Sequence, residues 1–492
     1  MAETNVPMWT RRDFLKAVGA GAAATALAGC AATGRRPTPD VPRRRPNIIF
    51  ILTDDQAPWA FGAAPNPDAY TPNMNKLRSE GVRLTNCFVT TPVCSPSRAS
   101  LLTSRYSTEL GITDFIKSKK AGLEPSFAAW PRMLAGAGYT TGLIGKWHLG
   151  EKDEYHPRLF GYNEFTGFRW GGETSKNPKI EVNGEVQQAQ GYTPDILTDY
   201  AVDFIRRKKG GPFMLSLHYW APHASTISRA SDRGHTWLPL SEADFSRFEN
   251  MDPEIPDPDF PKLDVPLVER MMREYLGSVA SVDRNLARIL ELLDDLKLTD
   301  NTVVIFTSDN GYNVGHNAVE GKGNASWTLT DNRQERPNLY DNSLRVPALI
   351  RWPGVITPGK TIEQTISFLD WFPTVLAMAA LSVPKDQTIR GRDFLPLLKG
   401  SVVEWDNDLF VQYTMRGAGV MRAYRTRRWK LVRDFDHFIK DELYDLANDP
   451  AETANLIDSP EPRIQNVRRS LNAKLLDKMR SINDPALPAT EL

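Results

Sequence analysis

The sequence predicts an α/β protein with a large, mixed, mostly parallel sheet that is covered by helices on both faces. Short apolar runs that are rich in β-branched residues are typical of strands buried on both faces. Three such runs occupy residues 47–52, 213–217 and 302–306. Between the last two, apolar residues recur at helical spacing over 270–296. Strands that alternate with helices along a chain favour this architecture.

The C-terminal part of the chain predicts a smaller subdomain. Short apolar runs recur there and predict an antiparallel sheet, and a helical pattern follows near 463–481. The runs lie at 409–413, 420–424, 429–433 and 442–446. We therefore predict a main domain over 47–400 and an α+β subdomain with an antiparallel sheet over 401–492. The segment 240–266 is rich in Pro and Asp and predicts a long surface loop.

Composition restricts the possible functions. The chain has 492 residues, enough for a large core and more than one domain, and its formal net charge is zero. A neutral chain has no general attraction for nucleic acid, so we expect no nucleic-acid partner. No strongly apolar run of about 18 residues follows the first thirty, so no transmembrane helix is expected in the mature body. The chain has three cysteines, too few for a disulfide scaffold, and Cys87 is expected to be a small buried hydrophobe.

The first thirty residues predict an export signal. Thr10–Lys16 contains an arginine pair typical of twin-arginine export, and an Ala/Gly-rich apolar run follows it and ends in Leu27-Ala28-Gly29-Cys30. This ending resembles a bacterial lipoprotein cleavage site, which would leave Cys30 as the lipidated N-terminus. The alternative is an Ala-rich helix, which the order of the three features disfavours. With 1–30 as the signal and the Pro/Arg-rich 31–46 as a tether, we expect an exported protein in the periplasm or on the surface of a bacterium, held to the membrane through its lipid alone.

Polar residues follow each of the three predicted strands. Asp54 and Asp55 end the first, the second ends near His218 and His223, and Asp309-Asn310 end the third. Ligands of open α/β sheets bind beyond the carboxyl ends of strands, so we expect these residues to share one site. Carboxylate and amide oxygens suit Ca²⁺ or Mg²⁺ rather than Zn²⁺. A solvated turn or a helix cap is the alternative for one Asp pair, but it does not account for a second pair on a distant strand.

The stretch from Cys94 to Thr103 predicts a helix that begins at a reactive residue. Pro96 is tolerated in a first helical turn because its missing N–H has no partner to lose there. Cys94 would then lie at the helix N-terminus, where backbone N–H groups and the helix dipole favour an anion. Arg98 follows one turn later and can reach the same place.

Cys94-Ser95-Pro96-Ser97-Arg98 resembles the signature of the formylglycine sulfatases, and the similarity extends from residue 47 to about 456. The resemblance implies an alkaline phosphatase-like fold, with 47–400 as the catalytic domain. It also implies oxidation of Cys94 to formylglycine by a formylglycine-generating or other sulfatase-maturing enzyme. The modification makes chemical sense: one hydroxyl of the hydrated aldehyde attacks sulfur, and the other, once deprotonated, collapses to the aldehyde and expels sulfate.

The resemblance also assigns roles to individual residues. It implies that one divalent cation, with Ca²⁺ favoured over Mg²⁺, is bound by a set of five residues. The implied ligands are Asp54, Asp55, Cys94, Asp309 and Asn310. Arg98, Lys146 and Lys322 would offset the charge of the transferring sulfate. His148 would accept the proton of the second hydroxyl, and His223 would protonate or stabilise the leaving group, with Lys322 assisting.

Some positions depart from the family pattern or allow two interpretations. Asn317 stands where relatives often have a second His, and Asp341 stands where Glu is usual, so neither inherits a role. His316 either contacts substrate or forms a hydrogen bond within its loop. His235 and Trp237 either touch a sugar or pack within the protein, and we favour packing.

Two other functions compete with a sulfatase that acts on a sulfated carbohydrate or another sulfate ester. A phosphomonoester or phosphonate ester hydrolase of the same superfamily would tend to have His at the position of Asn310, or Ser or Thr at that of Cys94. A catalytically dead lipoprotein that binds sulfated glycans would be expected to lack a ligand or a lysine. None of the matched positions is missing, so sulfate ester hydrolysis is the function the sequence favours.

Overall fold

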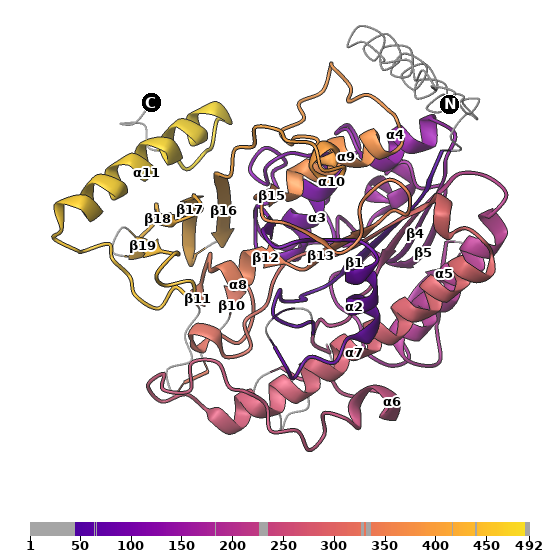
Figure 1. The fold of residues 1–492 in the computed structure, drawn as a ribbon, viewed down its shortest axis with the longest axis horizontal. Helices are drawn as coiled ribbons and strands as arrows, with labels where there is room; N and C mark the ends of the chain where they lie inside the picture. The colour runs from indigo at the N-terminus through magenta and orange to yellow at the C-terminus, as the bar shows by residue number, and fades with distance from the viewer. Residues whose placement is uncertain are drawn as a thin grey trace, which may run out of the picture. The chain divides into compact units, whose positions relative to one another are not determined.

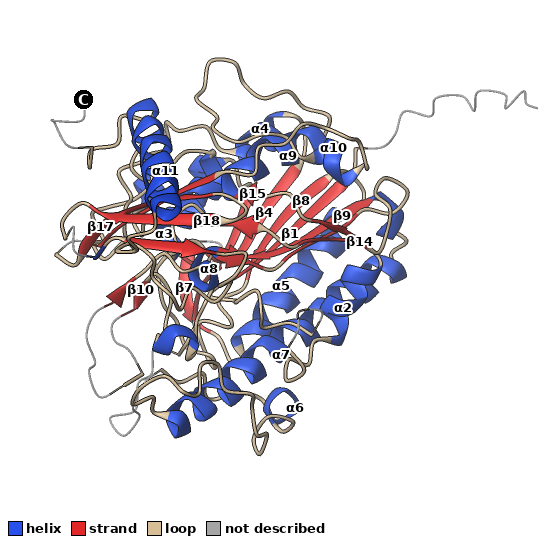
Figure 2. Cartoon of the chain, turned by 60° about the vertical axis from the view of Figure 1, so that its left-hand side comes forward, coloured by secondary structure: helices blue, strands red, loops and turns tan. Residues whose placement is uncertain are grey.

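The three strands predicted to be buried lie side by side in the centre of a ten-stranded sheet. The first of them, β1, is labelled in Figure 1, and all three are labelled in Figure 2. The computed structural model describes residues 45–487, apart from 63, 65, 183, 226–234, 326–328, 331–335, 416, 438–439 and the side chain of 336. The predicted signal, the tether and Cys30 therefore lie outside the described residues, except for 45–46 of the tether. No helix in the described part of the chain combines the length and apolar character that a bilayer crossing requires.

The sheet is mixed and its centre is parallel, which confirms the predicted fold class. From one edge to the other, its strands are β14 (Lys360–Ile362), β2 (Val82–Leu84), β13 (Ala348–Arg351), β9 (Thr302–Ser308), β1 (Asn47–Thr53), β8 (Phe213–His218), β4 (Thr140–Lys146), β5 (Glu164–Phe168), β6 (Lys179–Val182) and β7 (Glu185–Gln188). The four neighbours β9, β1, β8 and β4 all run parallel, whereas β13, β6 and β7 pair antiparallel with their neighbours.

Helices cover both faces of the sheet (Figure 2). One face carries α3 (Cys94–Thr103), α4 (Trp130–Gly136), α9 (Trp371–Met378) and α10 (Leu395–Leu398), and the other α2 (Pro72–Ser79), α5 (Thr193–Lys208), α6 (Glu242–Phe245) and α7 (Val265–Asp295). Alternate residues of β1 enter two separate cores: Phe50 packs with the first group and Ile51 with the second. This two-sided burial explains why β1 is apolar at consecutive positions.

The C-terminal region forms the predicted antiparallel sheet. Its strands are β16 (Leu409–Met415), β17 (Gly419–Arg425), β18 (Trp429–Asp434) and β19 (Glu442–Asp445), and helix α11 (Pro462–Ser481) packs on it. Several shorter elements complete the fold. The strands β3 (Cys87–Phe88), β12 (Arg345–Val346) and β15 (Ile366–Ser367) form a small sheet. Strand β10 (Asn324–Ala325) pairs with β11 (Arg336–Pro337), and helix α8 spans Asp341–Leu344.

The prediction that 240–266 is entirely a loop was wrong at two places. The short helix α6 forms within it, and the buried Asp244 of α6 accepts hydrogen bonds from Arg284 of α7. Helix α7 begins at Val265, five residues before the predicted start, because Asp264 caps the Leu267 N–H and a proline in the first turn costs no hydrogen bond.

Candidate active site

Four adjacent parallel strands end at the same edge of the sheet. The register pairs Leu52 of β1 with His218 of β8, and His218 in turn with Gly145 of β4. On the other side of β1, Thr53 pairs with Ser308 of β9. The polar residues that follow these positions must therefore leave the sheet next to one another, as the sequence predicts.

Tight backbone turns direct two of these side chains. Asp55 and His148 both have positive φ, 67° and 55°, in the left-handed region that residues other than Gly rarely adopt. Gly145 has a φ of 110°, and a Cβ at this position would lie 1.9 Å from the His218 carbonyl oxygen. A glycine is therefore required where β4 approaches β8 most closely, one residue before Lys146.

Helix α3 begins at Cys94, as predicted. Val93 before it is extended, and its side chain forms no capping hydrogen bond to the first turn. Cys94 is buried, and its Sγ lies 3.7 Å from Lys322 Nζ. Burial raises the pKa of the Cys94 thiol, although Lys146 and Lys322 act in the opposite direction, so the unmodified thiol is a weak nucleophile.

Three buried cations and three carboxylates lie together beside Cys94. Arg98 donates from Nε to Asp309 Oδ2 at 2.7 Å and also lies 3.7 Å from Asp54 Oδ2. Lys146 pairs directly with Asp54, and Lys322 pairs directly with Asp55. Both lysines that the resemblance assigns to sulfate therefore pair with carboxylates in this structure, although an ammonium group has three donors and one carboxylate does not occupy them all.

The carboxylates differ in their acidity. Burial alone would raise the pKa of Asp54, but Lys146, His223, Lys322 and Arg98 together lower it well below its usual range. Burial and the neighbouring Asp54 carboxylate raise the pKa of Asp309 to about 7. The ionised form of Asp309 is thus short of compensating positive charge, which an added cation would supply.

The cluster has atoms that fit a metal ion. Asp54 Oδ1 and Asn310 Oδ1 are buried and have no hydrogen-bond partner among the described residues. Buried polar atoms are nearly always paired, so unpaired oxygens in a charged cluster indicate a ligand. Ligand atoms of Asp54, Cys94 and Asp309 all lie within 4.8 Å of one another. The donor set is rich in oxygen and fits Ca²⁺ or Mg²⁺.

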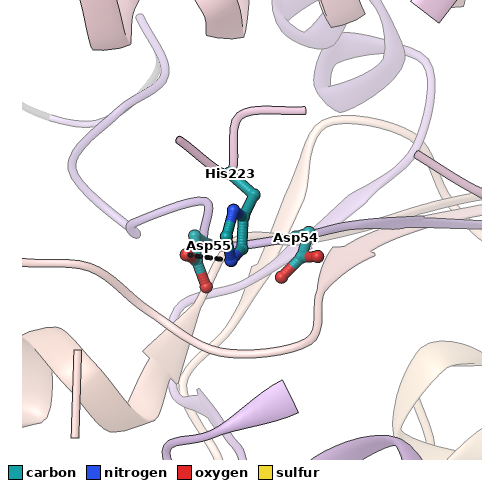
Figure 3. Close-up of side chains that lie close together, drawn as sticks. All are labelled: Asp54, Asp55 and His223. Carbon is teal, nitrogen blue, oxygen red and sulfur yellow. Dashed lines mark ion pairs between the residues drawn. The ribbon is translucent and has the colours of Figure 1, made fainter. Parts of the chain in front are cut away.

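His223 lies beside Asp54 and Asp55, the two carboxylates that directly follow β1 (Figure 3). Its Nε2 is 3.8 Å from Asp55 Oδ2, and its Nδ1 donates to the Ala224 carbonyl at 2.8 Å. Because a carbonyl can only accept, this contact assigns the hydrogen to Nδ1 in the neutral ring. Burial lowers the pKa of His223, so proton donation from Nε2 requires prior protonation of a ring that favours the neutral form.

His148 is also buried and neutral. Burial, followed by Lys146 and Arg98, lowers its pKa well below the usual range of histidine. Its Nδ1 has no hydrogen-bond partner in the described part of the protein. A Cβ added at Gly171 would lie 2.4 Å from its Nε2, so the imidazole occupies the space that a side chain at 171 would need. A neutral imidazole held in this way can accept a proton.

A cavity of about 120 Å³ lies over part of this cluster. Its wall includes Asp55, His223 and Lys322, three of the predicted site residues. The residues described as lining it do not include His316, which stacks on Trp59 at 5.1 Å between ring centroids and lines a second cavity.

Three residues at the site had no predicted role or a different one. His218 contacts the Lys146 carbonyl at 3.1 Å and Arg98 at 3.5 Å, and its strand-end position was the available signal. Glu320 and His235 line the cavity, although packing was favoured for His235. Trp237 is buried among apolar residues, as expected.

Asn317 is not among the described residues that line the cavity over the charged cluster. Its side-chain amide donates to the Ala451 carbonyl at 3.0 Å and to the Glu452 carbonyl at 3.3 Å. The departure from the family's usual His at this position is thus accompanied by a contact with the C-terminal region.

This fold and site define an α/β enzyme whose strand ends bring together buried cations, carboxylates and unpaired oxygens that fit a hard cation. The family model described as Sulfatase matches residues 46–381, and one described as N-sulphoglucosamine sulphohydrolase, C-terminal, matches residues 327–481. The chain belongs to the sulfatase family and is a hydrolase of sulfuric ester bonds. The family resemblance drawn from the Cys94 motif is confirmed.

Known relatives cover most of the chain. It is 28% identical over 515 residues to an N-acetylglucosamine-6-O-sulfatase of Bacteroides thetaiotaomicron, covering 89% of this chain and 86% of the relative. It is 30% identical over 427 residues to the N-acetylgalactosamine-6-sulfatase of Homo sapiens, covering 80% and 73%. A solved structure of a protein in complex with its substrate D-glucosamine-2-N,6-O-disulfate matches with a TM-score of 0.72 and 25% identity, covering 90% of this chain and 99% of that one.

Proposed function

We propose that this sulfatase releases sulfate from a sulfated carbohydrate, with Cys94 converted to formylglycine and one divalent cation bound beside it. The position of Cys94 carries the proposal. It is the first residue of α3, 3.7 Å from Lys322 Nζ, and its Sγ lies within 4.8 Å of oxygens of Asp54 and Asp309. The carbohydrate substrate is supported by the names of the relatives, two of which act on 6-sulfated N-acetylhexosamines.

The cation would be bound by residue 94 together with oxygens of Asp54, Asp55, Asp309 and Asn310, and we favour Ca²⁺ over Mg²⁺. When present, a hydrated formylglycine supplies a hydroxyl nucleophile and the cation supplies positive charge next to it. The formal charges of the three carboxylates and of the three cations, Arg98, Lys146 and Lys322, cancel. A divalent ion would therefore make this cluster positive, as the binding of a sulfate group requires.

Two histidines have opposite proposed roles in proton transfer: one accepts a proton and the other donates one. His148, neutral and buried, accepts the proton from the residue-94 hydroxyl that does not attack sulfur. His223, on the cavity wall, donates a hydrogen to the ester oxygen as the alcohol leaves. Lys322 lies at the same wall and stabilises negative charge on that oxygen.

We further propose that the enzyme is exported through its twin-arginine signal and tethered by a lipid on Cys30. The support is the order of Thr10–Lys16, the Ala/Gly-rich run and Leu27–Cys30 in the sequence. Replacing Cys30 by Ala should release the enzyme from the membrane fraction after export. A Cys30→Ala protein that still sediments with membranes would contradict the tether.

The test of the activity uses enzyme coexpressed with a formylglycine-generating enzyme. Sulfate or phosphate release is measured from 4-methylumbelliferyl sulfate, 4-methylumbelliferyl phosphate, N-acetylglucosamine 6-sulfate and N-acetylgalactosamine 6-sulfate. We expect sulfate release that depends on Ca²⁺ or Mg²⁺, and a peptide mass that shows an aldehyde in place of the Cys94 thiol. Faster release of phosphate than of sulfate, or turnover by a protein with an unmodified Cys94, would contradict the proposal.

A further inference from the structure

Glu320 is a buried carboxylate in the wall of the active-site cavity, with no assigned role. It lies two residues before Lys322, and 1% of its surface is exposed. Both residues line the cavity, together with His223 and His235. Burying a carboxylate costs free energy unless its oxygens have hydrogen-bond or ionic partners, so the partners of each Glu320 oxygen indicate its role.

One carboxylate oxygen of Glu320 has its partners within the protein. Oε1 accepts a hydrogen bond from the His235 backbone N–H at 2.5 Å and lies 2.8 Å from His235 Nδ1. The Tyr312 hydroxyl lies 3.1 Å from the same ring nitrogen. The other oxygen, Oε2, is buried and has no hydrogen-bond partner among the residues that the structure describes.

Glu274 shows what a purely structural carboxylate looks like in the same region. It supports the next two residues of the segment, because its Oε2 accepts from the Thr236 hydroxyl at 2.9 Å and from the Trp237 N–H at 3.0 Å. Its Oε1 accepts from Arg270 at 2.9 Å. Both oxygens of Glu274 are thus paired, and it is not among the described residues that line the cavity. Glu320 differs on both points: its side chain lines the cavity, and its second oxygen has no hydrogen bond from the described residues.

We propose that Glu320 binds a hydrogen-bond donor of the substrate, a sugar hydroxyl or an ammonium group, close to the sulfate ester. The inference rests on the proposed function and adds a selectivity to it. An ionised carboxylate can only accept hydrogen bonds, so it favours neutral hydroxyl or cationic amine neighbours. A second sulfate or a carboxylate near Glu320 would meet a like charge in a partly dry cavity and would be excluded.

Two matched series of sugars test the selectivity. The first comprises glucosamine 6-sulfate with a free amine, an N-acetyl group or an N-sulfate, so that one nitrogen carries positive, zero or negative charge. The second comprises N-acetylgalactosamine 6-sulfate with and without a further sulfate on O4. Each sugar is measured for sulfate release, and as an inhibitor of 4-methylumbelliferyl sulfate hydrolysis where it is not turned over. For each protein, the rate or inhibition constant measured for one member of a series is divided by that for another member. A general loss of activity cancels in this ratio.

We expect the natural enzyme to favour the cationic or neutral member over the anionic member in at least one series, by roughly tenfold. Glu320→Gln should bring that ratio close to one, and Glu320→Asp, which keeps the charge, should retain the preference. Glu274→Gln disturbs the same segment without changing the cavity wall and should keep the ratio of the natural enzyme.

Three results would overturn the inference: no preference in either series, an unchanged ratio in Glu320→Gln, or an equal collapse in Glu274→Gln. If the natural enzyme releases no sulfate from 4-methylumbelliferyl sulfate or from any of the sugars, the proposed function itself fails, and the inference with it.

Discussion

Two buried charge clusters in this protein differ in how completely they pair their atoms. The first surrounds Cys94. The second joins α8 to the C-terminal sheet, where Asp341 accepts hydrogen bonds from Arg425 and Lys430. Lys430 also pairs directly with Glu452, whose Oε2 accepts from the Asp341 N–H at 2.5 Å. Each carboxylate oxygen of Asp341 and Glu452 has a hydrogen bond or, in the case of Glu452 Oε1, a direct ion pair with Lys430.

The cluster at the strand ends is equally buried but incomplete. Asp54 Oδ1 and Asn310 Oδ1 accept no hydrogen bond from the described residues, and a cavity adjoins the group. Buried charges that find their partners within the protein indicate a structural role. Buried oxygens that accept no hydrogen bond from the protein indicate a site for a ligand. Substitutions should therefore affect activity in the first cluster and stability in the second.

The largest effect is expected from Cys94→Ala. It removes the residue proposed to become the nucleophile, so kcat/KM for sulfate esters should fall by about 10⁴-fold or more, while the fold is retained. Cys87→Ala is the matched control, because Cys87 is the other buried free cysteine among the described residues and lies in the apolar core. The control should lose stability and keep its activity; comparable turnover by the two variants would contradict the assignment of Cys94.

Lys146→Met should come next. Lys146 is buried and pairs with Asp54, which would still have Arg98 as a cationic neighbour. Removing one cation that stabilises the transferring sulfate should lower kcat/KM by about 10²- to 10³-fold. Steady-state kinetics measure this loss, and a decrease of less than about tenfold would show that Lys146 serves structure alone.

Lys430→Met is the counterpart in the structural cluster. It leaves Asp341 with Arg425 and Glu452 without its cation, so the free energy of unfolding should fall by about 3–5 kcal/mol. Denaturant unfolding gives this value. At a temperature where the variant is folded, its kcat/KM should match that of the natural enzyme. A large loss of kcat/KM in the folded variant would contradict a purely structural role for this cluster.

The smallest predicted effect tests the position of His148. A methyl group at Gly171 would meet the imidazole at 2.4 Å from Nε2, so Gly171→Ala should displace the ring and lower kcat by about 10- to 100-fold. Gly136→Ala is the control, because a Cβ there meets no neighbouring atom within 4 Å outside its own helix. Equal kcat values for the two variants would argue against His148 as the proton acceptor.

The sequence alone predicts much of the fold, because buried strands and long helices have strong apolar patterns. The strands β1, β8 and β9 follow from their continuous apolar runs, and so do their adjacent polar ends. The start of α7 was missed because Asp264 and Pro266 are as common in loops as in a first helical turn. Local pattern cannot separate the two.

The candidate site is less predictable, since tertiary contacts decide the partner of each side chain. The lysines at 146 and 322 were assigned to sulfate by motif, and their pairing with Asp54 and Asp55 emerges only in three dimensions. His235 and Glu320 come from separate segments, and no motif links them. His316 has a conspicuous motif, yet it stacks on Trp59 in another cavity.

The most direct test of the distinction is the effect of a divalent cation on thermal unfolding, measured for the natural enzyme, Asp309→Asn and Asp341→Asn. With Ca²⁺ or Mg²⁺ at about 100 times its dissociation constant, a native-state ligand adds about 2.7 kcal/mol of stability. We expect this gain in the natural enzyme, none in Asp309→Asn, and the full gain in Asp341→Asn despite its lower starting stability. No gain in the natural enzyme, or an equal gain in Asp309→Asn, would contradict a metal site at the strand ends.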